Sequence, residues 1–422
     1  MSATLSTLDN ILKEYYLGPV AEQLNNEVLL LNRLESRSED LVGKYAYVPL
    51  HYGRSGGIGA VGENADLPTA GYQQYYRAKY DLKYLYGRVR VTGPSMAKTK
   101  NEAGAFLQAL KSELDGLRND LRKDLARQVY GDGSAVIAQA AASSAVAGNV
   151  ITLASAEAIK KGQLYPNMKV DIFAYSSNAK SSSVTTTITA VNAATPSITV
   201  ESASGVADGD YIARAGAVAA QLNNATGSRS NEVDGLSRIV ATSAQDLGEV
   251  AVATYGWWDN KRLAPDFDPE VGGSQTALSL DLIQKALNTI RLEGANPSVM
   301  ITTLGVQREF YNLLSQDVQY IDPASLSYAA GFKTLSYNGM PLIADIDAPY
   351  GRMYVLDEST MKVFSDQDWH FLDADGQTLR QVSDKDAFEA IMVRYMNLGA
   401  TKRNNQMVIS GITVDGTTDA GV

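Results

Sequence analysis

Apolar and polar residues alternate in two stretches of the N-terminal third of the chain, residues 44–52 and residues 76–91. A period of two is typical of a β-strand with one buried face. The segment between them, residues 53–71, holds six glycines, so we expect one long two-stranded hairpin with a glycine-rich tip. Such a ribbon has almost no core of its own and is marginally stable in water. We therefore expect it to pack on a neighbouring copy of the chain.

Residues 100–130 have the spacing of one long helix, because leucines recur there every three or four residues and form a narrow apolar stripe. The leucines are Leu107, Leu110, Leu114, Leu117, Leu121 and Leu125. The opposite face carries acid-to-base pairs at i,i+3, namely Asp115 with Arg118, Asp120 with Lys123 and Asp124 with Arg127. We expect this face to be solvated, the helix to span roughly 45 Å, and Gly131-Asp-Gly133 to end it.

The composition changes over residues 134–216, where only ten of 83 residues are charged and Ser, Thr, Ala and Val dominate. Short strand patterns separated by Gly, Pro and Asn turns predict a small β-barrel or sandwich. The expected strands are 150–153, 168–173, 184–188, 197–200 and 210–212. With the linker that follows, we assign residues 134–232 to an inserted β domain.

The remainder of the chain mixes helical and strand periods, which predicts an α+β domain. Ser279 is placed to cap a helix whose apolar stripe ends at Ile290, and a second helix is expected over residues 303–314. The expected strands are 341–344, 353–356, 361–364, 388–395 and 407–410. At the chain ends, residues 5–35 have the spacing of short helices in a mobile arm, and the polar residues 413–422 are expected to fray.

The composition excludes several classes of protein. With 45% apolar and 20% charged residues over 422 positions, the chain is globular and long enough for two or three domains. It has no cysteine, which excludes disulfides and thiolate metal sites. The longest aliphatic run covers residues 28–31 and no basic, then apolar, leader is present, so we expect neither a membrane span nor a secretion signal.

The formal net charge of −10 argues against a protein that grips phosphate backbones by counterion release. It is compatible with a container for nucleic acid, because an acidic inner wall lets a packed polymer slide and leave. Simple solubility explains the charge equally well.

Two motif matches lie in the glycine-rich segment. Gly53-Arg-Ser55-Gly-Gly57 fits the pattern of a nucleophile elbow, with His51 nearby, and Gly57-Ile-Gly59-Ala-Val-Gly62 fits a dinucleotide fingerprint. Both motifs require a helix to follow, and the sequence up to Pro68 predicts none. We therefore expect loop glycines here and no catalytic residue or cofactor site.

Metal and acid–base sites are not predicted either. The two histidines, His51 and His370, have no second histidine at helical or strand spacing. The acidic pairs Asp266-Phe-Asp268 and Asp373-Ala-Asp375 lack the spaced ligands of a calcium loop, so turns are the better interpretation.

Tyrosines cluster in and after the glycine-rich segment. They are Tyr72, Tyr75, Tyr76, Tyr80, Tyr84 and Tyr86. Base stacking would call for basic grooves between them, which this acidic chain does not offer. We expect these rings to supply contact area between subunits.

Three short segments follow one another along the chain: the hairpin segment Gly62-Glu-Asn-Ala-Asp-Leu-Pro68, the helix end Tyr130-Gly-Asp-Gly133 and the segment Val233-Asp-Gly-Leu-Ser-Arg-Ile239. They are followed by Asn338-Gly-Met-Pro-Leu-Ile343 and by the turn from Trp369 to Gly376. In this order the chain resembles the tailed-phage major capsid proteins of the Hong Kong 97-type fold. Residues 134–232 look like an insertion into that α+β fold.

The resemblance implies a division of the chain into six parts. They are an N-terminal arm (1–43), a hairpin called the E-loop (44–99), a peripheral domain with a long spine helix (100–133, continued by 365–412), the inserted β domain (134–232), an axial domain (233–364) and a flexible tail (413–422). The E-loop would lie on a neighbouring subunit. Its expected contact residues are Gly56, Gly57, Gly59, Gly62, Glu63, Pro68, Tyr72, Tyr75 and Tyr76.

The resemblance also implies partners and a location. Pentamers and hexamers of the chain would tile an icosahedral shell around double-stranded DNA, in a virion capsid assembled in the host cytoplasm. Because the arm begins close to Met1, the resemblance implies a separate scaffolding protein or none. A portal and a decoration protein are further partners that the resemblance implies. Two alternatives stay open: an encapsulin-type shell that encloses a cargo enzyme, and a hydrolytic enzyme.

The lysine pattern bears on how such a shell is held together. Some members of the family join subunits by an isopeptide bond from an E-loop lysine. Residues 53–78 contain Arg54 and Arg77 but no lysine, and Lys79 and Lys83 follow only on the returning arm. An arginine is a poor nucleophile because it stays protonated. We therefore expect a non-covalent shell.

Overall fold

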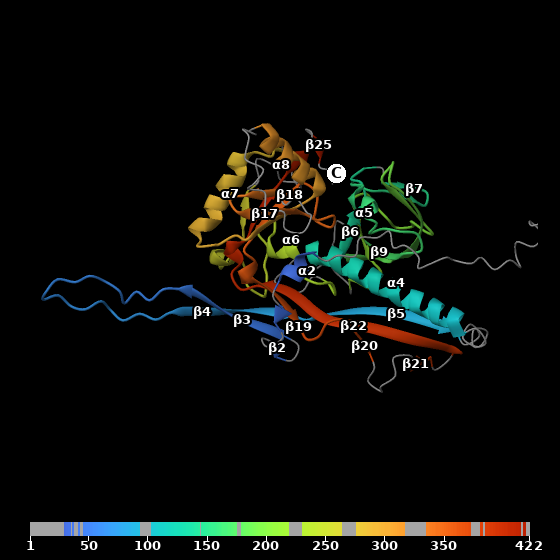
Figure 1. The fold of residues 1–422 in the computed structure, drawn as a ribbon, viewed down its shortest axis with the longest axis horizontal. Helices are drawn as coiled ribbons and strands as arrows, with labels where there is room; N and C mark the ends of the chain where they lie inside the picture. The colour runs from blue at the N-terminus through green and yellow to red at the C-terminus, as the bar shows by residue number, and fades with distance from the viewer. Residues whose placement is uncertain are drawn as a thin grey trace, which may run out of the picture.

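The computed structural model describes residues 29–34, 36–37, 41–42, 45–92, 103–143, 145–174, 179–218, 230–263, 276–316, 335–372, 380–382, 385–414 and 417–418. A long hairpin projects from one end of the body (Figure 1). A long sheet continues from its base toward the opposite end, and a helix, a small β domain and a two-helix domain lie above that sheet. The expected α+β class is confirmed.

The hairpin belongs to a sheet of three strands, β2 (Leu41–Val42), β3 (Tyr45–Gly53) and β4 (Gln74–Asp81). β3 and β4 are antiparallel, from Tyr45 opposite Asp81 to Gly53 opposite Gln74. The base of this hairpin has a core within its own chain, which corrects our expectation. Its buried members are Ala46, Val48, Leu50, Ala78 and Tyr80, all in the largest hydrophobic core of the molecule.

The returning arm pairs with β3 only as far as Asp81. β5 (Lys83–Thr92) pairs antiparallel with β22 (Ala387–Ala400), so the prediction of one continuous hairpin is wrong beyond Asp81. Alternation reveals a strand but not its partner, and here the partner lies about three hundred residues away along the chain. The other edge of β22 carries β19 (Met361–Ser365), β20 (His370–Phe371) and β21 (Arg380–Gln381), and β1 (Ser36–Arg37) pairs with β19.

The predicted long helix is confirmed as α4 (Ala103–Tyr130), which lies along the β5–β22 sheet (Figure 1). It passes very close to β5 at Gly87, where an added Cβ would lie 2.5 Å from Leu121 Cδ1. Only glycine allows this approach. Past the helix end, Gly133 has a φ of 71°, a left-handed conformation that glycine adopts without strain. Of the predicted arm, α2 (Leu29–Arg33) is described, and residues 1–28 lie outside the described part.

The β domain forms a sheet of its own, with strand order β6-β12-β9-β10-β11-β8-β7. The strands are β6 (Val136–Gln139), β7 (Val146–Ala147), β8 (Val150–Thr152), β9 (Lys169–Ala174), β10 (Ala179–Asn192), β11 (Ser197–Val200) and β12 (Tyr211–Arg214), with one short helix, α5 (Glu157–Lys160). Each of the five predicted strands is present. The domain has a separate core that includes Ile151, Ile172, Ile188 and Ile198.

The two-helix domain packs α7 (Leu280–Leu292) and α8 (Leu304–Gln316) on a sheet of order β13-β23-β18-β15-β17-β16. The predicted cap is confirmed, because Ser279 Oγ accepts a hydrogen bond from the Leu282 amide at 3.2 Å. The strands are β13 (Lys261–Leu263), β15 (Val299–Thr302), β16 (Leu335–Tyr337), β17 (Met340–Ala344), β18 (Arg352–Leu356) and β23 (Met407–Ser410). Short helices α6 (Leu236–Ile239), η1 (Gly256–Trp258), η3 (Glu358–Thr360) and η4 (Arg403–Asn405) connect the parts.

Strand pairing changes three expected boundaries. β19 belongs to the long sheet, whereas β23 belongs to the two-helix domain. The tail does not fray throughout, because β24 (Ile412–Val414) pairs with β14 (Thr276–Ala277) and with β25 (Thr417–Thr418), and Val414 is buried. Within the part of the chain that the structure describes, no helix is both long enough and apolar enough to cross a bilayer.

Candidate functional site

The hairpin tip is the most exposed apolar segment that the structure describes. Residues 54–73 contain neither helix nor strand and extend away from the body (Figure 1). Ile58 is 84% exposed, Leu67 82% and Tyr72 78%. Large apolar side chains held this far from any core leave a contact surface that no other described segment of the chain covers.

The predicted contact residues of the hairpin do not all have the same environment. Those that are exposed are Gly56, Gly57, Gly59, Gly62, Glu63 and Tyr72 on the tip, and Tyr75 at the start of β4. Pro68 is half-buried and lies against Gly59. The two sides of the tip approach closely where Gly71 faces Gly56, since an added Cβ on Gly71 would lie 2.7 Å from the Gly56 nitrogen.

An aromatic cluster that the sequence analysis missed anchors the base of the hairpin to the loop before β13. The Tyr52 and Trp257 rings stack at a centroid distance of 4.9 Å, and Tyr76 lies 4.7 Å from Tyr255. Close by, Lys79 Nζ donates to Glu249 Oε1 at 2.8 Å. The Tyr76 side chain therefore packs within its own chain, and this packing fixes the direction in which the tip projects.

The tyrosine cluster divides into core and surface members. Tyr80 is buried and its hydroxyl donates to the Ala400 carbonyl at 2.9 Å, so the expectation of a subunit contact is wrong for this residue. Tyr72, Tyr75, Tyr84 and Tyr86 are exposed, as a contact surface requires.

The two glycine motifs have no catalytic geometry. Ser55 Oγ accepts from the Gly57 amide at 3.3 Å, and His51 Nε2 contacts Gln73 Oε1 at 2.7 Å instead of the serine. No helix follows either motif, as the sequence predicts, because residues 54–73 are irregular throughout. Among the described residues no group of His, Asp and Glu side chains is arranged to hold a metal ion.

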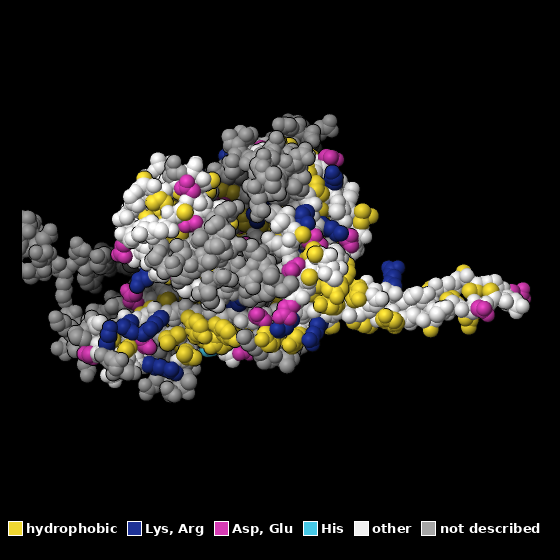
Figure 2. All heavy atoms as spheres, turned by 180° about the vertical axis from the view of Figure 1, so that it is seen from behind, with side chains coloured by type: hydrophobic (Ala, Val, Ile, Leu, Met, Phe, Trp, Pro, Cys, Tyr) yellow, Lys and Arg dark blue, Asp and Glu magenta, His cyan; other side chains and the backbone are white. Residues whose placement is uncertain are grey.

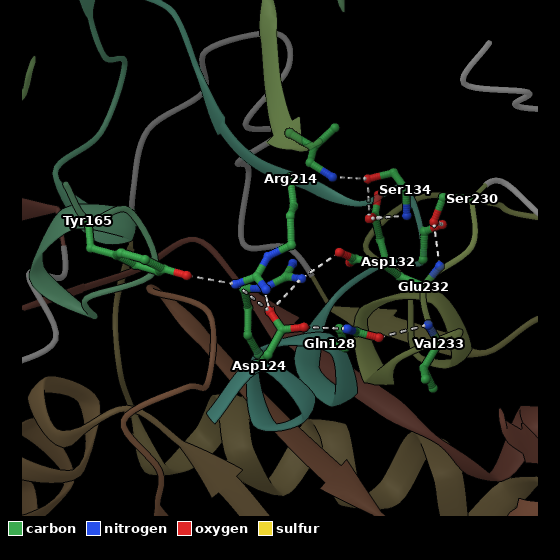
Figure 3. A network of polar contacts seen from close by, with 12 residues as sticks. Asp124, Gln128, Asp132, Ser134, Tyr165, Arg214, Ser230, Glu232 and Val233 are labelled. Carbon is green, nitrogen blue, oxygen red and sulfur yellow. Dashed lines mark hydrogen bonds and ion pairs between the residues drawn. The ribbon is translucent and has the colours of Figure 1, made fainter. Parts of the chain in front are cut away.

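A buried charge network joins α4 to the β domain (Figure 3). Arg127 Nη2 lies 3.3 Å from Asp124 Oδ1 and 2.5 Å from Glu232 Oε1. Asp124 also accepts from Arg214 of β12 at 3.3 Å and from Gln128 at 2.8 Å. The side chains of Asp124 and Arg127 are therefore only 18% and 9% exposed, which corrects the expectation that this helix face is solvated throughout.

The electrostatics of this network favour the charged forms of its members. Burial alone would raise the pKa of the Asp124 carboxyl, but the Arg127 and Arg214 guanidiniums outweigh burial and hold that pKa below its ordinary value. The pKa of Arg127 is raised, because Glu232 and Asp124 together outweigh its burial. The network is thus a charged joint between two parts of the chain.

A cavity of about 290 Å³ lies beside this joint, between β5, α4 and the β domain. Its lining includes cations from all three elements, Arg88, Lys123 and Arg214, and the acids Asp120, Asp124 and Asp347. Charges of both signs alternate around it, so it resembles a packing crevice more than a site for a charged ligand.

Asp347 at this cavity should make stability depend on pH. Burial raises the pKa of its carboxyl to about 6, and the neighbouring Asp345 adds to the shift. Since 3.8 is the ordinary value, the stabilisation from the protonated form is complete below about pH 4 and lost as the pH rises through about 6. The unfolding free energy of wild type should therefore fall as the pH rises, whereas that of Asp347→Asn lacks this contribution. We expect the difference, variant minus wild type, to be about 2 kcal/mol larger at pH 7 than at pH 4.

Urea unfolding at several pH values measures this difference. Asp366→Asn is the matched control, because Asp366 is exposed, and its curve should parallel that of wild type. A pH-independent difference between Asp347→Asn and wild type would contradict the assignment.

Comparison with known proteins places this geometry in context. No protein-family model and no curated protein sequence matches the chain. Among solved structures, a chain of the cyanophage A-1(L) capsid asymmetric unit superposes with a TM-score of 0.60 at 13% identity, over 97% of this chain and 100% of that one. The capsid of a native GTA particle and the SrpI encapsulin complex from Synechococcus elongatus PCC 7942 both match at 8% identity, with TM-scores of 0.49 over 98% of this chain.

The first match is between complete folds, and at 13% identity it establishes a shared fold rather than a shared activity. The expected resemblance to phage capsid proteins is thereby confirmed at the level of architecture. The chain has the fold of a phage capsid chain.

Proposed function

We propose that this chain is the major capsid protein of a tailed phage, and that pentamers and hexamers of it form an icosahedral shell around packaged double-stranded DNA. The observation that carries the proposal is the likeness to a phage capsid chain over nearly the whole length of both proteins. The exposed hairpin tip supports it, because none of the described segments covers the apolar side chains there. The role is structural, and we assign no enzymatic activity.

Each part of the molecule takes a role in this proposal. The hairpin of β3 and β4 is the E-loop, and α4 with the sheet around β22 forms the peripheral domain. The two-helix domain is the axial domain, formed by residues 233–360 with β23 added, because β19 belongs to the sheet around β22. Residues 134–232 are an insertion that adds to subunit contacts. β5 belongs to the peripheral sheet, so the E-loop proper ends near Asp81.

The acidic character of the chain supports the proposed enclosure of DNA. Its net charge of −10 suits a wall that encloses DNA without binding particular sequences. A separate scaffolding protein, a portal and a decoration protein would complete the particle in the virion. We propose that the particle assembles in the host cytoplasm.

Electron microscopy of the purified protein, alone and with lysate from infected cells, tests the proposal. We expect closed shells of uniform size, and nuclease-protected double-stranded DNA in particles from infection. A strictly monomeric species under all salt and partner conditions would overturn the proposal. Shells filled with a cargo enzyme instead of DNA would identify an encapsulin-type container.

We expect the shell to be held without covalent links between subunits. Lys79 is engaged by Glu249 of its own chain, and its Nζ lies 3.9 Å from the centroid of the Tyr45 ring. Lys83 is buried and donates to the Ser230 carbonyl at 2.6 Å. Boiling mature particles in detergent should release one band at the monomer mass, and a ladder of covalent oligomers would point first to these two lysines.

A further inference from the structure

The β domain contacts two other parts of its own subunit. One contact joins it to α4 through Arg214, and the other joins it to the two-helix domain through Lys161. We infer that the β domain is a strut, which holds the axial domain at one angle to α4 and thereby sets the curvature of the shell. The inference rests on the proposed function, because curvature is a property of the assembled particle.

A strut has to be stiff, and the sheet of the β domain is closed. Its strand order begins with β6 and ends with β8 and β7, and the chain just after β6 pairs with the chain just after β8. The Ala141 amide donates to the Thr152 carbonyl at 2.9 Å, and the Ala154 amide donates to the Gln139 carbonyl at 2.9 Å. A sheet whose ends meet in this way bends less than an open sheet, because its strands are held on both sides.

The β domain carries few charges, and three of them lie at its contacts with the rest of the subunit. Only ten of the 83 residues 134–216 are charged, and from behind the surface of the β domain shows few charged side chains (Figure 2). The three at the contacts are Glu157 and Lys161, at the two ends of α5, and Arg214 of β12. Hydrogen bonds between charged groups are directed, so they fix an angle better than apolar packing, which has no direction.

The attachment to α4 includes the points where the chain enters and leaves the β domain. Arg214 Nη2 lies 3.3 Å from Asp124 Oδ1 on the helix (Figure 3). Ser230 Oγ donates to the Gly133 carbonyl at 3.0 Å, which ties the leaving segment to the entering one. The β domain is therefore held on α4 by side chains as well as by its two connecting segments.

Lys161 attaches the β domain to the loop between β17 and β18, residues 345–351. Its Nζ donates to the Ala348 carbonyl at 2.7 Å and to Glu157 Oε1 at 2.6 Å. The same Nζ lies 4.6 Å from the centroid of the Tyr350 ring, and the Tyr350 amide donates to Glu157 Oε1 at 3.3 Å. The Lys161 side chain is only 3% exposed. Lysine is rarely buried to this extent unless its charge is paired, so this contact is specific.

The two attachments brace a third contact, at the end of α4. The hydroxyl of Tyr130, the last residue of the helix, donates to Asp345 Oδ2 of the same loop at 2.7 Å. Asp124 lies six residues earlier in the helix, about 9 Å along its axis. The β domain thus closes a triangle between Asp124, the end of α4 and the loop. Three separated contacts resist tilting, whereas the contact at Tyr130 alone acts near one point.

Release of the Lys161 attachment tests the inference. Repeated contacts close a shell of one size only when every copy presents them at the same rotation. We expect Lys161→Met to assemble in a yield within about twofold of wild type, but with a spread of particle diameters at least about twofold wider and with open particles. Electron microscopy measures the diameters. Lys160→Met is the matched control, because Lys160 is an exposed residue of the same short helix, and its particles should match those of wild type.

A second variant releases the same attachment from its other partner. Glu157→Ala removes the carboxylate that accepts from both Lys161 and the Tyr350 amide. The Glu157 side chain is 32% exposed, so its loss is less costly to folding than the loss of Lys161. We expect the same widening of diameters, and this variant decides the question if Lys161→Met does not fold.

Hydrogen exchange of the unassembled protein separates the strut from its role in the shell. Amides of residues 345–351 should exchange about tenfold faster in Lys161→Met and in Glu157→Ala, and at the wild-type rate in Lys160→Met. Unchanged exchange in the first two variants would overturn the strut. Faster exchange with wild-type diameters would overturn the role in curvature and leave the proposed function intact. Wild-type protein that forms no shells would overturn the proposed function together with that role, while the exchange rates would still show whether the β domain braces the subunit.

Discussion

We expect deletion of residues 56–69 to leave a folded subunit that no longer forms closed shells. The deleted tip contains neither helix nor strand, and the base of the hairpin stays in the main core through Val48, Leu50 and Tyr80. The ends of the deletion can be joined with little strain, because Gly71 on one side already lies close to Ser55 on the other, where an added Cβ on Gly71 would lie 2.9 Å from Ser55 Oγ. Loop ends with few intrachain contacts tolerate such changes.

The size of the effect follows from what the deletion removes. Ile58 and Leu67 each leave more than four-fifths of their surface exposed, so their burial in a contact between subunits would contribute about 1.5–3 kcal/mol per side chain. Losing both at every contact of a shell is enough to abolish assembly.

Circular dichroism and thermal unfolding check the subunit, and electron microscopy checks the particles. We expect the thermal midpoint to stay within a few degrees of wild type, because no buried side chain is lost. Leu67→Ser serves as the control for chain length, because it removes an apolar side chain of the tip without shortening the chain. We expect it to lower the yield of shells as well. A deletion variant that unfolds would show that the tip has intrachain contacts, and normal shells would remove the hairpin from the proposed assembly.

Alternation in the sequence was sufficient to find strands but not to pair them. β3, β4 and β5 all show the expected period, yet β4 turns back to β3 while β5 continues to β22. Leu82 marks the change of partner, and nothing in its identity signals it. Tyr80 was misjudged for the same reason, because its contact with Ala400 depends on a segment three hundred residues further along.

Features that depend on residues close together in the sequence were predicted more successfully. Ser279 caps α7 as expected, and the strands of the β domain occur where turn residues separate apolar runs. These features depend on neighbours within a few residues. The aromatic anchor of Tyr52 on Trp257 joins segments two hundred residues apart, so local patterns contain no sign of it.

The burial of the charged joint at Asp124 could not be predicted from the spacing of Asp124 and Arg127. An i,i+3 pair on a helix is usually a solvated pair worth a few tenths of a kcal/mol. Here residues Arg214 and Glu232, at the end of the β domain, cover it. One signal was available: charges are rare between residues 134 and 216, and two of those present, Lys161 and Arg214, make contacts outside the β domain.

Replacing Arg127 by methionine should therefore cost far more than a surface pair suggests. The substitution keeps much of the apolar stem but leaves Asp124 and Glu232 buried without their shared cation. Removing one partner of a buried pair typically destabilises by about 3–5 kcal/mol, because an uncompensated charge remains out of water. We expect the unfolding free energy of Arg127→Met to fall by about 3 kcal/mol, since Arg214 still neutralises part of the Asp124 charge.

Arg118→Met is the matched control for this change. Arg118 pairs with Asp115 at the same i,i+3 spacing on the same helix, but both side chains are half exposed. Its loss should change the unfolding free energy by less than about 0.5 kcal/mol. Urea unfolding of the unassembled protein measures both variants, and equal effects would show that the joint is no stronger than a surface pair. Adding Asp124→Asn and Glu232→Gln to Arg127→Met should recover part of the loss, because the cost comes from the stranded charges and not from the missing contact area.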